Sequence, residues 1–89
     1  MVWDIKWSKT AEDQLAKINK SNKKMAQKIV TKLEEITDDP YAYTKKLRNF
    51  NLRRLKVVGY RVLVSLEQRK MVIFVVETGP RGEIYEKYR

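Results

Sequence analysis

The sequence predicts a two-layer α+β domain in which an N-terminal strand and a helical hairpin pack on a mainly antiparallel sheet, in the order β-α-α-β-β-β. Three observations predict it. Apolar residues alternate near the N-terminus, recur at helical spacing over the next two segments, and form strands at hairpin spacing in the C-terminal half. The 89 residues leave room for one core, so we expect a single domain over 1–89.

The first strand is predicted at residues 2–7, where the sequence VWDIKW alternates between apolar and charged side chains. A period of two places Trp3, Ile5 and Trp7 together on one face of such a strand. We therefore expect a half-buried strand whose two tryptophans belong to the core.

Two antiparallel helices are predicted next, separated by a break at residues 19–22. Ser8 or Thr10 can cap the first helix, which carries a single apolar stripe along one face. The members of this stripe are Ala11, Leu15 and Ile18. The short break between the helices predicts that they form a helical hairpin.

The second helix has the clearer pattern. Ser21 or Asn22 can cap its start, and the letters DDP at residues 38–40 end it. Its apolar stripe comprises Met25, Ile29, Leu33 and Ile36, and the lysines that face away from it are Lys23, Lys24, Lys28 and Lys32. We expect the stripe to pack in the core.

The C-terminal half is predicted to be mainly β. A connecting segment at residues 41–51 leads into it, with the start of a strand near Leu47. Short strands are expected at 53–57, 60–66 and 71–77. Residues 71–76 (MVIFVV) are apolar on both faces, which predicts a central strand covered on both sides. Residues 78–82 (TGPRG) are predicted as a turn and residues 83–89 as a short tail.

Charge and composition limit the possible functions. The chain has 20 Lys and Arg against 11 acidic residues, a net charge of +9 and a pI near 9.9, which indicate a polyanionic partner, either nucleic acid or an acidic protein. Without cysteine or histidine it has no disulfide, no thiolate metal site and no histidine base, so we expect no metal or cofactor. Because it shows neither a secretory signal nor an apolar run of about 20 residues, we expect a cytoplasmic protein without a membrane partner.

Cations gather at the hairpin predicted within LRRLKVVGYR, residues 52–61. Strand alternation places Arg54 and Lys56 on one face, and a loop of two or four residues places Lys56 directly opposite Arg61. A three-residue loop with a bulge would break this pairing. Directly opposed like charges are destabilising, and a bound polyanion relieves their repulsion. The cluster therefore predicts a phosphate site.

The next hairpin brings further functional groups toward this cluster. In its matching register Arg61 lies opposite Val76. Arg81, framed by glycine and proline, can then swing over the same patch, and Tyr85 can follow it. Such a site suits RNA cleavage, in which the 2′-hydroxyl attacks the adjacent phosphate and expels the 5′-oxygen. A lysine or tyrosine of lowered pKa could act as base, and arginine could stabilise the phosphorane.

Four short motifs follow one another in the C-terminal half: Arg54-Leu55-Lys56, Gly59-Tyr60-Arg61, Gly79-Pro80-Arg81 and Glu83-Ile84-Tyr85. Together with the β-α-α-β-β-β order, their succession resembles the RelE/ParE toxins of bacterial and archaeal toxin–antitoxin pairs. The resemblance covers nearly the whole chain and is strongest in its C-terminal half. It implies a RelE-like fold and, for a RelE-type member, a metal-independent endoribonuclease that cleaves mRNA in the ribosomal A site and so inhibits translation.

The resemblance also implies residue roles. By position, Arg54 and Lys56 match the family's paired strand cations, and Arg61 matches its phosphate-stabilising arginine. Arg81 matches the leaving-group arginine and Tyr85 the C-terminal tyrosine, so Lys56 or Tyr85 would be the base and Arg81 the acid or its helper. Arg54 stands where lysine is often found, and because arginine keeps its proton we expect it to act electrostatically. Catalysis is thus assigned to Lys56, Arg61, Arg81 and Tyr85, and RNA binding to Arg54, Lys56, Arg61 and Arg81.

The partners implied by the resemblance are a cognate antitoxin and the ribosome. A RelB-like, acidic antitoxin would wrap the toxin through a helix or an extended segment, hold it inactive and form an oligomer with it. The 70S ribosome would present the mRNA in its A site, where the toxin also meets rRNA.

Two alternatives stay open. A ParE-like toxin on the same fold would inhibit DNA gyrase by binding, without cleavage, although such members usually lack the full cationic and tyrosine set. A passive RNA-binding module would use Trp3, Trp7 and Phe74 as stacking platforms. Trp3 and Trp7 fit the core better, since they share one face of the first strand with Ile5.

Overall fold

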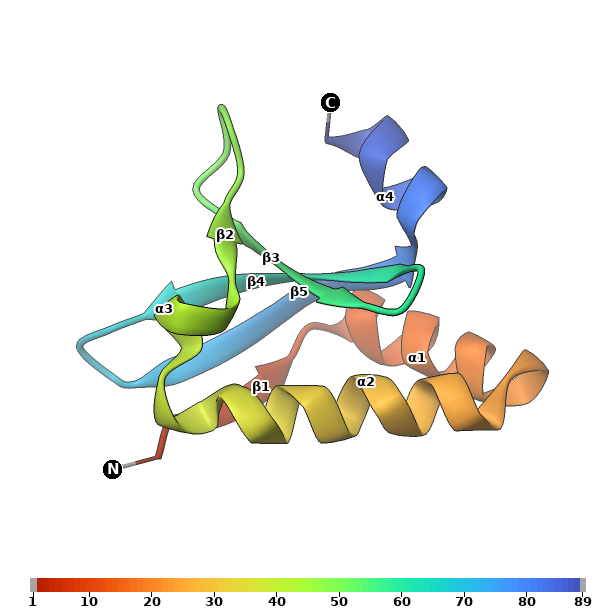
Figure 1. Ribbon diagram of the computed structural model, residues 1–89, viewed down its shortest axis with the longest axis horizontal. Coiled ribbons are helices and arrows are strands. Elements are labelled where there is room, and N and C mark those ends of the chain that lie inside the picture. The colour runs from red at the N-terminus through yellow and green to blue at the C-terminus, as the bar shows by residue number, and fades with distance from the viewer. Residues whose placement is uncertain (1, 89) are drawn as a thin grey trace.

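One five-stranded sheet organises the fold, with a helical hairpin against one face (Figure 1). The computed structural model describes residues 2–88. Its elements are β1 (Asp4–Trp7), α1 (Lys9–Ser21), α2 (Lys23–Glu35), the 3₁₀ helix η1 (Ile36–Asp38), α3 (Pro40–Tyr43), β2 (Lys45–Lys46), β3 (Arg53–Val57), β4 (Tyr60–Glu67), β5 (Val72–Pro80) and α4 (Arg81–Lys87). In the order β1-β5-β4-β3-β2, β1 pairs parallel with β5 and the other neighbours pair antiparallel. The predicted α+β class is confirmed.

Side-chain caps define where the two long helices begin. The Ser8 hydroxyl oxygen accepts a hydrogen bond from Ala11 N at 2.9 Å, and Asn22 Oδ1 accepts one from Met25 N at 3.1 Å. Of the two candidate caps for each helix, Ser8 therefore caps α1 and Asn22 caps α2. Asn22 also ends α1, so a single residue separates the helices. Within residues 2–88, no helix has the length and apolar character needed to cross a membrane.

The core lies between the helical hairpin and one face of the sheet. Ile29 and Leu33 of α2 have no exposed surface. The buried residues that the sheet contributes are Leu55, Val57, Val62, Val64, Ile73 and Val75. Trp3 is buried as predicted, and Trp7 packs half-buried against the core. Because its ring is enclosed, Trp3 cannot serve as a stacking platform for RNA, which weakens the passive-binding alternative.

β5 differs from its prediction in length and register. It continues through residues 78–80, which were predicted as a turn, and Arg61 lies opposite Gly79 rather than Val76. The register follows from the short connection between β4 and β5 and from a β-bulge beside Leu63, which adds one residue to β5. As a result, the chain reaches Gly79 beside Arg61 and enters α4 two residues later.

The C-terminal residues form a helix where the sequence predicted a tail. α4 packs over the second face of the sheet, where Ile84 and Leu63 are 5% and 1% exposed. Because α4 is short, it covers only this end of the sheet. Phe74 stays 37% exposed and Val72 half-buried, so the prediction that residues 71–76 are covered on both sides is wrong.

The connecting segment contains two small elements that the sequence reading missed. Pro40 opens α3, because the first helical position needs no N–H donor. The edge strand β2 at Lys45–Lys46 ends just before Leu47, where a strand was predicted to start. Leu47 N donates a hydrogen bond to Leu52 O at 2.9 Å and closes the loop that leads into β3.

The β3–β4 turn contains a strained residue. Val58 has a φ of 20° and Gly59 a φ of 78°, and the Val58 side chain is 74% exposed. A β-branched residue is unfavourable here, whereas asparagine tolerates the left-handed region. We therefore expect Val58→Asn to raise the free energy of unfolding by about 1 kcal/mol, measured as a higher urea midpoint at unchanged slope. Val58→Ile is the matched control with no expected gain, and an equal gain in both variants would contradict the strain.

Candidate functional site

The β3–β4 hairpin has the register that the sequence predicted, with Lys56 opposite Arg61. Arg54 shares their face of the hairpin because side chains alternate along the strand. Arg53 takes the other face, where its Nε donates a hydrogen bond to Thr44 Oγ1 at 2.8 Å. The pairing therefore assigns three cations to one face of the hairpin, and two of them, Arg54 and Arg61, line a pocket beside α4.

Arg61 is the buried member of this cluster. Its side chain is 7% exposed, and its Nη1 donates a hydrogen bond to Tyr60 O at 2.9 Å. Within residues 2–88 its Nε has no hydrogen-bond partner and no carboxylate is paired with it. A buried charge without a counter-ion is unfavourable unless an anion binds to it. Arg61 is therefore positioned as the centre of an anion site.

Three arginines surround the Tyr85 side chain. Arg54 Nη1 donates a hydrogen bond to the Tyr85 hydroxyl at 3.2 Å. The guanidinium carbons of Arg81 and Arg61 lie 5.1 Å and 5.9 Å from the centre of the tyrosine ring. The structure thus brings together Arg54, Arg61, Arg81 and Tyr85, although β3, β4 and α4 supply them separately.

The two tyrosines of the C-terminal segment differ in acidity. Hydrogen bonding to Arg81, and then to Arg61, lowers the pKa of Tyr85 below its usual value. Burial, reinforced by the neighbouring Glu77 carboxylate, raises the pKa of Tyr88 to about 12. Tyr85 is therefore the more acidic of these two tyrosines, and it lies beside arginines that can bind a phosphate.

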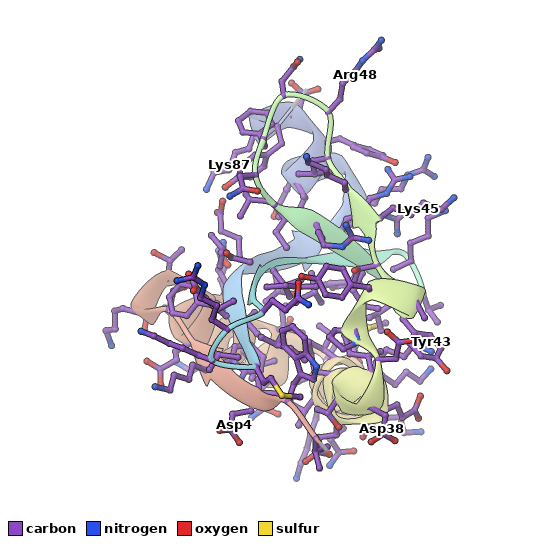
Figure 2. The ribbon with its side chains drawn as sticks, turned by 90° about the vertical axis from the view of Figure 1, so that its left-hand side faces the viewer. Asp4, Asp38, Tyr43, Lys45, Arg48 and Lys87 are labelled. Carbon is purple, nitrogen blue, oxygen red and sulfur yellow. The ribbon has the colours of Figure 1, made fainter. Side chains whose placement is uncertain are left out.

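Lys56 lies beside this group but makes no hydrogen bond to Tyr85. It is exposed and lines a groove of about 510 Å³ between α2 and the hairpin, together with lysines of α2. These are Lys24, Lys28 and Lys32. A smaller groove continues past Lys45 to Arg54, and Figure 2 shows Lys45 projecting from the fold. Positive charge thus extends from the site along one side of the molecule.

No metal centre accompanies these cations in the part of the chain that the structure describes. Residues 2–88 contain no group of three or more acidic, cysteine or histidine side chains arranged to hold a metal ion.

The loop before β3 forms the other wall of the site, and the sequence reading missed it. A pocket of about 300 Å³ lies between this loop and α4, with Arg54 and Arg61 among its lining residues. From the loop, Leu47 and Asn49 line it, and Asn49 has a φ of 67°. The dipeptide Asn49-Phe50 within a polar segment was a signal for a turn, but not for a wall of this pocket.

Glu77 is a second residue that the sequence reading missed. It is 6% exposed, and its carboxylate accepts hydrogen bonds from Lys87 Nζ at 2.5 Å, Gln14 Nε2 at 3.2 Å and the Tyr88 hydroxyl. Burial acts to raise the pKa of Glu77, but the hydrogen bonds from Lys87, Tyr88 and Gln14 outweigh it and hold this pKa below its usual value. Glu77 therefore ties α4, which carries Arg81 and Tyr85, to the sheet and to α1.

We expect Glu77→Gln to lower the free energy of unfolding by about 1–2 kcal/mol at neutral pH, since the exposed Lys87 is partly screened by solvent. Because the folded-state pKa of Glu77 is depressed, its charge stabilises the folded protein fully when the pH is above 4.5, the ordinary pKa of a glutamate. This stabilisation is lost as the pH falls through the folded-state pKa. Urea unfolding of both proteins from pH 7 to pH 3 measures this. A stability difference that does not shrink in acid would contradict the role of the Glu77 charge.

Comparison with known proteins identifies the family and the fold of this chain. Residues 5–85 match the family described as "ParE toxin of type II toxin-antitoxin system, parDE". The fold is similar to the toxin–antitoxin complex RelBE2 from Mycobacterium tuberculosis, with a TM-score of 0.82 and 15% identity over 91% of this chain and 93% of that one. It is also similar to a free mutant of the E. coli toxin RelE (TM-score 0.76, 23% identity, 99% and 95% of the chains).

A third similar structure is the chromosomal ParDE system of P. aeruginosa, with a TM-score of 0.71 and 13% identity over 89% of this chain and 96% of that one. No curated protein matches the sequence. At such low identities the structural similarities establish the fold, and they include both RelE and ParE proteins.

Proposed function

The chain belongs to the ParE toxin family of type II toxin–antitoxin systems, within the RelE/ParE superfamily, and on this premise we propose that it is a ribosome-dependent endoribonuclease that cleaves mRNA in the A site. The observation that carries this proposal is the buried Arg61 beside Tyr85, which has no carboxylate partner among residues 2–88. A protein that acted only as a docking surface would have no need of a buried guanidinium facing a tyrosine of lowered pKa.

The arranged groups account for each part of the reaction. The Tyr85 phenolate takes the proton of the 2′-hydroxyl, whose oxygen attacks the adjacent phosphorus. Arg61 and Arg54 stabilise the charge that develops on the phosphorane oxygens. The bond from phosphorus to the 5′-oxygen then breaks, Arg81 stabilises the negative charge on the leaving oxygen, and this oxygen takes a proton from solvent water. The products are a 2′,3′-cyclic phosphate and a 5′-hydroxyl.

Lys56 remains the alternative base, because it lies opposite Arg61 on the same face. Its position in the lysine-lined groove supports a different role, in which it binds the RNA backbone next to the reacting phosphate. Tyr85 is the better candidate since it contacts the arginines directly.

Gyrase inhibition is the second candidate function. The family match to ParE toxins and the similarity to a ParDE system favour it. The Arg54, Arg61, Arg81 and Tyr85 cluster favours the nuclease, because inhibition by binding has no use for a proton acceptor.

Primer-extension mapping in a translation extract, beside a gyrase supercoiling assay, separates the two functions. We expect the wild-type protein to cut mRNA at a fixed position within codons only when ribosomes are present, and to leave supercoiling unchanged. Inhibited supercoiling without any cut would overturn the nuclease proposal and establish the second candidate.

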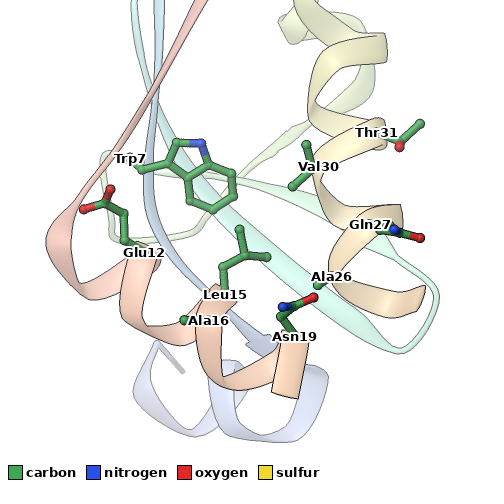
Figure 3. Close-up of a pocket in the computed structure, with 9 residues that line it drawn as sticks. All are labelled: Trp7, Glu12, Leu15, Ala16, Asn19, Ala26, Gln27, Val30 and Thr31. Carbon is green, nitrogen blue, oxygen red and sulfur yellow. The ribbon is translucent and has the colours of Figure 1, made fainter. Parts of the chain in front are cut away.

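We further propose that this chain has a cognate antitoxin, as the proteins in the similar toxin–antitoxin complexes do, and that it binds across α2. An apolar groove of about 780 Å³ lies between α1 and α2, and Figure 3 shows Trp7, Leu15 and Val30 pointing into it. Gln27 and Thr31 line both this groove and the lysine-lined groove on the other side of α2. An amphipathic, acidic segment would therefore fill the apolar groove and reach the lysines.

We expect Val30→Glu to raise the Kd of the acidic protein encoded beside this chain by about tenfold or more, because a carboxylate would enter the apolar groove and repel the acidic segment. Ribosome-dependent cleavage should persist, since the groove and the site occupy opposite faces of the sheet. Calorimetric titration measures the affinity, with Gln27→Ala at the rim as the control that stays within about threefold. Equal affinity of Val30→Glu and wild type would exclude this groove.

A further inference from the structure

The pocket beside the arginine cluster differs in character from the rest of the site. Its floor is apolar, because Leu63 and Ile84 are 1% and 5% exposed. Tyr85 and Tyr88 of the C-terminal segment line one side, and the loop before β3 lines the other. A ligand that fits must combine a flat apolar surface with a polar edge and a nearby anion.

The loop and the C-terminal segment meet directly, so the pocket is a built feature. Phe50 packs edge-to-face on Tyr88, with ring centres 5.1 Å apart and an interplanar angle of 76°. The hydrogen bond between Leu47 N and Leu52 O closes the base of the loop. Buried Arg61, with its unpartnered Nε, lines the same pocket from below.

We propose that this pocket binds the nucleobase attached to the reacting phosphate group, and that Asn49 reads the edge of that base; this inference rests on the proposed RNA cleavage. A base of single-stranded RNA has two flat apolar faces that pack on aromatic and aliphatic side chains, and a polar edge that side chains can recognise. The phosphate of the same nucleotide would lie on Arg54 and Arg61.

Asn49 is the residue suited to reading the base. It is exposed in the loop, its backbone adopts a φ of 67°, and it lines the pocket. The amide carries one acceptor and one donor side by side, the pattern that pairs with N6 and N7 of adenine. Pyrimidines lack N7, and guanine carries an acceptor in place of the N6 donor, so a base that presents this edge to Asn49 is selected as adenine. Arg48 lines the same pocket and lies near the loop tip in Figure 2, where it can meet the RNA backbone.

The test uses four short RNA oligonucleotides that differ only in the base 5′ of the reacting phosphate. A 2′-O-methyl group on that nucleotide prevents cleavage, so fluorescence anisotropy measures binding alone. We expect the wild-type protein to prefer adenine by about tenfold. Asn49→Gly keeps the left-handed backbone but removes the amide, and should reduce this preference to within about twofold. Asn49→Asp, which also tolerates this backbone, loses the donor and should lose the preference for adenine.

Asn51→Gly is the matched control, because Asn51 is exposed in the same loop but does not line the pocket. It should keep the adenine preference. Equal binding of all four oligonucleotides by the wild type, or an unchanged preference in folded Asn49→Gly and Asn49→Asp, would overturn the inference.

Cut-site mapping with the same variants separates this inference from the proposed function. Suppose that the wild type cleaves mRNA, and that Asn49→Gly cuts at the same sites and binds the four oligonucleotides with the same preference for adenine. The assignment of the pocket then fails, while the proposed nuclease activity stands. If the wild type cuts nothing but shows an adenine preference that depends on Asn49, the nuclease fails while the base pocket stands.

Discussion

Replacing Arg61 with glutamine is expected to slow ribosome-dependent mRNA cleavage by about 10²–10³-fold without lowering the free energy of unfolding. The first effect follows because Arg61 is the buried charge available to the phosphorane. The second follows because its guanidinium is 7% exposed and has no carboxylate partner among residues 2–88, so the folded protein bears the desolvation of an uncompensated charge. Single-turnover cleavage on purified ribosomes and urea unfolding measure the two effects.

Arg53→Gln is the matched control for this prediction. Arg53 precedes the cluster on β3, but it packs on Tyr41 and donates hydrogen bonds to Thr44. Its replacement should lower the free energy of unfolding by about 1–3 kcal/mol and leave the cleavage rate nearly unchanged. The opposite pattern, with stability lost in Arg61→Gln and activity lost in Arg53→Gln, would contradict the assignment of Arg61 to the anion site.

Removing the hydroxyl of Tyr85 is expected to have the second large effect. Tyr85→Phe should slow cleavage by about 10²–10⁴-fold, because the ring stays between Arg61 and Arg81 while the proton acceptor is lost. For the wild type, the rate should rise with pH as Tyr85 ionises and level off once the pH passes its pKa, which the arginines hold below the ordinary value of 10.0. Tyr85→Phe should lose this rising limb. Rates on purified ribosomes between pH 6 and pH 9 test it.

Tyr88→Phe is the control for the pH dependence. With a pKa of about 12 and a hydrogen bond to Glu77, Tyr88 stays protonated throughout this range. Its replacement should lower stability but retain the rising limb. If Tyr85→Phe keeps the limb and Lys56→Gln loses it, Lys56 is the base instead, and the role given to Tyr85 is wrong.

Local patterns were sufficient to predict part of the site. Alternation along a strand assigns Arg54 and Lys56 to one face, and a two-residue turn then places Arg61 opposite Lys56, as the structure confirms. The helices were predictable for a similar reason. Apolar residues at helical spacing share one face of a helix, so Ile29 and Leu33 of α2 were expected to face the core together.

Features that depend on distant contacts were not predictable. The β-bulge beside Leu63 shifts the β5 register, so Arg61 faces Gly79 and not Val76. Residues that look like a polar tail form α4 because Ile84 finds an apolar surface on the sheet. Glu77 appeared to be the end of a strand, and only the folded chain brings Gln14, Lys87 and Tyr88 to its carboxylate.

The sequence by itself determined the two-layer class, the helical hairpin and the crowding of Arg54, Lys56 and Arg61, because each depends on periodicity within one or two neighbouring elements. Tertiary structure alone decided which of these cations contact the tyrosine. Burial of Arg61, the approach of α4 and the loop wall at Asn49 arise from segments far apart in the chain. Their meeting leaves the Arg61 charge buried and, among residues 2–88, without a carboxylate partner.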